Sequence, residues 1–119
     1  MSNPFVHVEL ASTDPEAARA FYGKLFDWNF STVPMPGGEY TMVQVGTGTG
    51  GGIMKQPMPG APSAWLAYVE VADITAATAK AKALGATVMK DVTEVMGMGW
   101  LSIIVDPTGA TLGLWKTKA

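Results

Sequence analysis

Residues 6–20 read VHVELASTDPEAARA, and residues 66–79 read LAYVEVADITAATA. Each stretch opens with five or six mostly apolar or alternating residues, some of them β-branched, which is typical of a strand. An aspartate, Asp14 or Asp73, then precedes an alanine-rich run, and this order is typical of a helix N-cap. Pro15 follows Asp14 at the first helical position, where proline is tolerated. The two stretches therefore predict the same strand and helix, repeated 59 residues apart.

The repetition continues further along the chain. Residues 40–45 (YTMVQV) correspond to 100–105 (WLSIIV) at a spacing of 60, and residues 52–55 (GIMK) correspond to 113–116 (GLWK) at a spacing of 61. Three matches in the same order indicate a duplicated module. Each copy is expected to contain a strand, a helix and three further strands. The linker between them, residues 56–62 (QPMPGAP), contains three prolines and is expected to be extended.

Length and composition exclude several classes of protein. The chain has 119 residues, enough for one domain with a core of its own. Because it has no cysteine, disulfide scaffolds, iron–sulfur sites and thiol catalysis are excluded. The net charge of −2 argues against a nucleic-acid partner. No apolar run is long enough to span a membrane and residues 1–4 do not resemble a signal peptide, so we expect a cytoplasmic protein.

Several motifs within this repeat are typical of one superfamily. They are the residues 7–10 with Asp14, the pair Phe21 and Tyr22, the segment 26–28, and the stretch from Asp106-Pro107-Thr108-Gly109 to Leu114 and Trp115. In these motifs, and in its two modules, the whole chain resembles the vicinal oxygen chelate superfamily of glyoxalase, bleomycin-resistance and extradiol dioxygenase proteins. Within it, the chain is most similar to short bacterial proteins related to lactoylglutathione lyase.

The resemblance implies an α+β fold of two βαβββ modules that form an incomplete barrel around a concave cleft. The whole chain, 1–119, would be a single glyoxalase-like domain, with module one at about 1–59 and module two at about 60–119. A small-molecule ligand would bind in the cleft between the modules. Homodimers are common in this superfamily, so the resemblance also implies a homodimer.

The metal-dependent members of the superfamily hold one divalent ion with four side chains, two on first strands and two on last strands. The matching positions here are His7, Leu66, Gly52 and Gly113. Only His7 has a donor atom, and a single imidazole is too few ligands for a catalytic metal. We therefore expect neither a metal nor another cofactor. A shifted site that uses Glu9 or Glu70 with His7 stays open as an alternative.

Strand periodicity selects the residues that would face a ligand, because alternate side chains share one face of a strand. On this basis the aromatic and polar residues of one face form a site for a small aromatic or cationic molecule. The expected ligand-binding residues are His7, Glu9, Tyr40, Gln44, Tyr68, Glu70, Trp100, Ser102 and Trp115.

No catalytic residue is assigned. Metal-independent binding is the favoured function. The first alternative is an enzyme of the lyase, isomerase or dioxygenase type with a shifted metal or none, in which a buried Glu9 or Glu70 could serve as a base. The second is an interaction module that forms dimers through apolar surface. The glycine-rich run 46–52 lacks the lysine and the following helix of a phosphate-binding loop, so a loose hairpin is expected there.

Overall fold

The computed structural model describes residues 2–118, which form two helices and eight strands. The chain divides into two compact units, which are described separately. The first unit contains residues 7–66, and the second contains residues 2–6 and 67–118. Neither helix of the described residues has the length and apolar character needed to cross a membrane.

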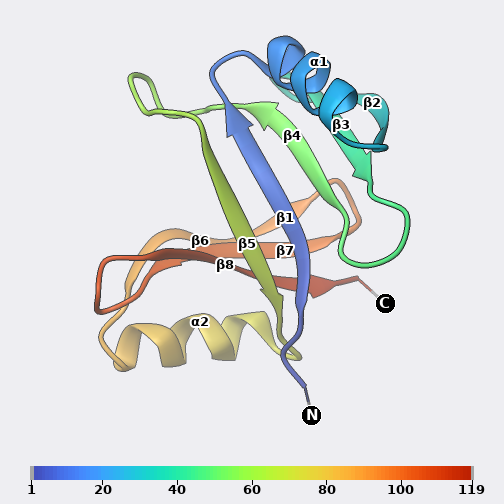
Figure 1. Ribbon diagram of the computed structural model, residues 1–119. Helices are drawn as coiled ribbons and strands as arrows, with labels where there is room; N and C mark the ends of the chain where they lie inside the picture. Colours follow the sequence, from blue (N-terminus) through green and yellow to red (C-terminus); the bar gives the residue numbers. More distant parts are fainter. Residues whose placement is uncertain (1, 119) are drawn as a thin grey trace. The chain divides into compact units, whose positions relative to one another are not determined.

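The first unit contains most of β1 (Phe5–Ser12), followed by α1 (Pro15–Leu25), β2 (Asn29–Met35), β3 (Gly38–Gln44) and β4 (Gly51–Lys55). Its strands lie in the order β2-β3-β4-β1. The first strand runs parallel to β4, and the other neighbours are antiparallel. The helix lies over one face of this sheet, which leaves the opposite face without a helix (Figure 1).

The second unit repeats this arrangement with most of β5 (Ala64–Glu70), α2 (Ile74–Ala83), β6 (Thr87–Val95), β7 (Gly99–Val105) and β8 (Thr111–Thr117). Its strands lie in the order β5-β8-β7-β6, with β5 parallel to β8. Its helix covers one face of the sheet (Figure 1). The predicted order of strand, helix and three strands is confirmed in both units.

Both helices begin where the sequence predicts. Asp14 accepts a hydrogen bond from the Ala17 amide at 3.1 Å, and Asp73 accepts one from the Ala76 amide at 3.0 Å. These bonds satisfy amides that the first helical turn leaves without a partner. The second helix ends before Gly85, whose φ of +105° lies in the left-handed region that glycine tolerates.

The core of each unit lies between the helix and the sheet. Leu10, Val43 and Ile53 form the buried cluster beneath α1, while Val71, Ile74 and Leu114 form the one beside α2. The face of β1 that carries Leu10 therefore packs on the helix. His7 and Glu9, at the alternate positions, lie on the other face, as predicted.

The prediction that Trp100 and Ser102 of β7 face the ligand is wrong, because both lie on the side of the sheet that packs on α2. Trp100 packs against the cluster beside α2, and Ile104 is buried on the same face. Ser102 is fully buried there, and its hydroxyl lies 2.8 Å from the hydroxyl of Thr78 on the helix. In the first unit the buried residue at the corresponding position is Thr41. Ser102 is therefore the counterpart of Thr41, at a repeat spacing of 61, whereas the predicted spacing of 60 pairs Thr41 with Leu101. A shift of one residue moves every side chain of a strand to the other face.

Candidate functional site

The open face of the first unit's sheet, the face without a helix, gathers most of the polar residues that the sequence nominates. The register pairs Glu9 with Gly52 across β1 and β4, and Met42 with Gly52 across β3 and β4. Paired residues lie on the same face of a sheet. Strand alternation adds the remaining members of this face, which are His7, Tyr40, Gln44 and Met54.

His7 and Tyr40 are directly bonded at the centre of this face. The His7 Nε2 atom lies 2.8 Å from the Tyr40 hydroxyl, which is a hydrogen bond between β1 and β3. The two ring planes are nearly parallel, at 21° to each other, with the ring centres 6.5 Å apart, so the rings meet through their polar edges. The Glu9 carboxylate lies 3.9 Å from the same Nε2, which is too far for a hydrogen bond and makes an ion pair only when the imidazole is protonated. The three side chains form a compact polar group.

The pKa of His7 is lowered from its ordinary value, first because burial disfavours the charged imidazolium. The negative charge of Glu9 acts in the opposite direction and raises the pKa, but it does not overcome burial. The side chain of His7 keeps 28% of its exposure and that of Glu9 keeps 17%. At neutral pH the imidazole of His7 is therefore neutral.

Gly52 makes this arrangement possible. A Cβ atom at position 52 would overlap the hydroxyl and ring of Tyr40, so the ring lies in the space that a side chain at 52 would occupy. This role of Tyr40 could be predicted only in part from the sequence. Strand alternation places Tyr40 and Gly52 on one face, but it does not predict the side-chain rotamer of Tyr40.

The residues present do not fit the metal site of the superfamily. The Tyr40 ring occupies the space beside Gly52, and the Tyr68 ring would overlap a Cβ atom at Gly113. No last-strand side chain can therefore reach an ion at either position while these rings stay in place. Within residues 2–118, no group of three or more His, Cys, Asp or Glu side chains could hold a metal ion.

The open face of the second unit is more apolar. The register pairs Tyr68 with Gly113 and Glu70 with Trp115 across β5 and β8, so these predicted residues share the expected face. Tyr68 is only 3% exposed, while Glu70 and Trp115 are partly exposed. The Trp115 indole N–H donates to the hydroxyl of Thr117 at 2.9 Å.

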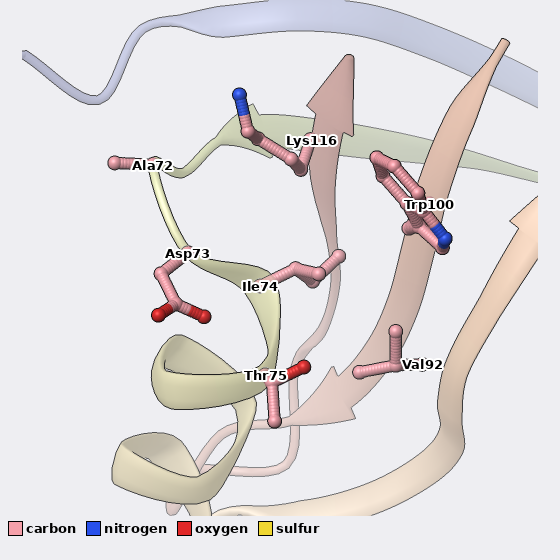
Figure 2. A pocket seen from close by; sticks show the side chains of 7 residues that line it. All are labelled: Ala72, Asp73, Ile74, Thr75, Val92, Trp100 and Lys116. Atoms are coloured by element: carbon pink, nitrogen blue, oxygen red, sulfur yellow. The ribbon is translucent and has the colours of Figure 1, made fainter. Parts of the chain in front are cut away.

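Trp100 and Ser102 do not belong to the open face. Trp100 lines a groove of about 320 Å³ at the start of α2, with Ile74 and Val92 facing it and Lys116 on the neighbouring strand (Figure 2). Ser102 is 0% exposed, so it is not available to a ligand. Gln44 is exposed at the end of β3, away from the bonded pair.

The two βαβββ units, with a histidine on the first strand, define the class of protein to which the chain belongs. The comparison with protein families gives the same class. The model of the glyoxalase-like domain matches residues 7–114. The chain belongs to this family, and with it to the vicinal oxygen chelate superfamily. The predicted recognition is confirmed at this level.

The chain is similar to several curated proteins. It is 37% identical over 117 residues to the Mycobacterium bovis protein named "Putative glyoxylase CFP32", an alignment that covers 93% of this chain and 44% of the relative. It is 26% identical over 123 residues to the anthracycline biosynthesis protein DauV of Streptomyces sp. strain C5, covering 91% of this chain and 45% of the relative. The chain thus spans less than half the length of these relatives.

Solved structures share the fold. The Bacillus halodurans protein BH1468, described as hypothetical, superposes with a TM-score of 0.77 at 15% identity, covering 100% of this chain and 97% of that one. The methylmalonyl-CoA epimerase of Mycobacterium tuberculosis superposes with a TM-score of 0.74 at 14% identity, covering 97% and 88%. At these identities the likeness shows the fold alone, and the α+β class is confirmed.

Proposed function

We propose that the protein binds a small aromatic or cationic molecule, without a metal, on the open face of the β2-β3-β4-β1 sheet. The observation that carries this proposal is the bonded pair of His7 and Tyr40 beside the Glu9 carboxylate. The pair offers two nearly parallel rings to a flat or cationic ligand, and the carboxylate offers a negative charge. The glyoxalase-like family supports a role in small-molecule binding.

The surroundings of the pair favour an apolar ligand body. Met42 is 38% exposed on this face, and Met54 lies beside Tyr40, with which it pairs across β3 and β4. Methionine side chains are flexible and polarisable, so they adapt to aromatic surfaces. A carboxylate among such groups favours a ligand that carries an amine or another hydrogen-bond donor. On the second unit, Glu70 and Trp115 are separately proposed as contacts for a ligand of the same class.

Two matched probes test the proposal. 1-Naphthylmethylamine and 1-naphthylmethanol share one ring system and differ in charge, and an anthracycline is added because of the name of the DauV relative. We expect the amine to raise the melting temperature more than the alcohol. At a ligand concentration 100 times Kd, the gain in stability is about 2.7 kcal/mol. The chelator EDTA should leave the gain unchanged.

Variants then locate the site. We expect His7→Ala to abolish the shift for every probe, and Glu9→Gln to reduce the preference for the amine. The control is Glu39→Gln, which removes an exposed carboxylate at the odd-numbered position next to Tyr40, on the opposite face by alternation. If His7→Ala binds all three probes as well as the unmodified protein does, the proposed site is wrong.

An enzyme of the lyase, isomerase or dioxygenase type is the second candidate. It is favoured by the close grouping of three ionisable side chains, because such groups can exchange protons with a bound substrate. Elemental analysis of the purified protein distinguishes the candidates, followed by assays with added divalent ions. A stoichiometric metal whose removal abolishes turnover, and which His7→Ala fails to bind, would favour the enzyme.

A homodimer in the cytoplasm completes the proposal. Phe21 and Leu25 are 59% and 55% exposed on α1, which is more apolar surface than a helix facing water usually presents. Sedimentation velocity at several concentrations tests the dimer, and we expect Phe21→Ser to weaken it. A monomer at every concentration would contradict this part of the proposal.

A further inference from the structure

We propose that Tyr40 is the residue that excludes metal ions from His7, so that the phenol takes the place that an ion occupies in metal-dependent relatives. This inference rests on the proposed metal-independent function. It concerns the specificity of the site, and it assigns to Tyr40 a role that follows from two contacts of its side chain. One contact is with Gly52 and the other is with His7.

The first contact closes the space at position 52. The Tyr40 ring comes from β3 and lies over Gly52 of the adjacent strand β4. A carboxylate or imidazole at 52 could approach His7 only if the ring moved away. Glycine at 52 and tyrosine at 40 are therefore a matched pair, because the absence of a side chain at 52 leaves the space that the Tyr40 ring fills.

The second contact occupies the imidazole nitrogen. The Nε2 atom of His7 either accepts a hydrogen bond from the Tyr40 O–H or carries a proton and donates one to the Tyr40 oxygen. In the first case the hydrogen bond occupies the Nε2 lone pair. In the second case Nε2 carries a proton, and a metal binds only an unprotonated nitrogen. Removal of the phenol would take away this hydrogen bond.

The second unit independently shows the same packing of a tyrosine ring over a last-strand glycine. The Tyr68 ring, which comes from β5, lies over Gly113 of β8, and a Cβ atom at 113 would overlap it. In both units a tyrosine from an adjacent strand thus fills the space of a last-strand glycine. The repetition indicates that ring-over-glycine packing is a built feature of these sheets rather than an accident at one position.

Cobalt(II), followed by its visible absorption and by the NMR signals of the His7 ring, tests the inference. We expect Tyr40→Ala to bind Co²⁺ about 10- to 100-fold more tightly than the unmodified protein, a range typical of changes next to a metal ligand. Tyr40→Ala combined with Gly52→Glu should bind more tightly again, since it adds a second carboxylate beside His7 and Glu9. Adding His7→Ala to either variant should abolish the gain.

Met42→Ala is the matched control, because it removes another side chain of the same face and keeps both Tyr40 and Gly52. We expect it to gain no affinity for Co²⁺. The inference is overturned if Tyr40→Ala, shown to be folded by circular dichroism, binds Co²⁺ no better than the unmodified protein does. It is also overturned if the unmodified protein binds Co²⁺ through His7 as tightly as the double variant. The naphthyl probes report on the proposed function separately, because they require no metal.

Discussion

Position 52 tolerates no side chain while Tyr40 keeps its orientation. We expect Gly52→Ala to destabilise the protein by about 1–3 kcal/mol, because the new methyl group overlaps the Tyr40 ring and forces it aside. Chemical denaturation measures this cost. In Tyr40→Ala the same substitution should cost much less, since the ring is gone and the two changes are coupled. Equal costs in both backgrounds would mean that the ring does not occupy this space.

His7 makes the stability of the protein depend on pH. Because its folded-state pKa is lowered from 6.5, the unfolded chain binds more protons over the interval between the two values. The free energy of unfolding should therefore fall as pH decreases from about 7 through 6.5, and the loss should end below the lowered pKa. His7→Gln should remove this dependence. The chain has one histidine, so a single imidazole NMR titration gives the folded pKa directly.

Some of the residue-scale detail could be predicted from the sequence. The alternation of residues 6–10 places His7 and Glu9 together on the face opposite Leu10, and the structure agrees. The bond between His7 and Tyr40 could not be predicted, since it depends on strand pairing and on one tyrosine rotamer. The glycines at 52 and 113 indicated missing ligands, but not the rings that fill their space.

Among the elements, helix starts were predictable and the face of β7 was not. Aspartate N-caps act locally, so the sequence contains the whole signal. The face of β7 depends on residues inserted before it. β6 has 9 residues against 7 in β2, and register shifts interrupt its pairing with β7. These extra residues change the repeat spacing from 59 at the helices to 61 at β7 and β8.

The bond between β7 and α2 gives a test of the corrected face. The Thr78 hydroxyl donates to the Ile74 carbonyl at 2.7 Å, so the Ser102 hydroxyl donates to Thr78. Ser102→Ala removes this bond inside the core and should lower the free energy of unfolding by about 1 kcal/mol. The control Ser31→Ala, at an exposed position of β2, should change it by less than about 0.5 kcal/mol. If Ser102→Ala instead impairs probe binding at unchanged stability, Ser102 faces the ligand after all.

The N-cap of α2 gives a second test at this scale. Asp73→Ala should lower the free energy of unfolding by about 1 kcal/mol, because the Ala76 amide loses its acceptor. Asp73→Asn should retain most of the stability, since an amide oxygen also caps a helix. Urea denaturation measures both, with the exposed Asp27→Ala as control. Equal losses for the alanine and asparagine variants would contradict a capping role.

For the whole molecule, the two units are built alike but differ in their open faces. The first has the bonded pair of His7 and Tyr40 with Glu9, and the second has the buried Tyr68 beside Gly113. The duplicated module follows from the repeat in the sequence, and the α+β class from the resemblance to the superfamily. The identity of a ligand does not, because it depends on how side chains fill the face rather than on the order of the strands.

The most direct test of metal-independent binding uses protein whose metal content has been determined by elemental analysis. Its melting temperature is measured with 1-naphthylmethylamine, in the presence and in the absence of EDTA. We predict a rise that is the same in both conditions and absent in His7→Ala. A rise that appears only with a stoichiometric divalent ion, and disappears with EDTA, would contradict the account.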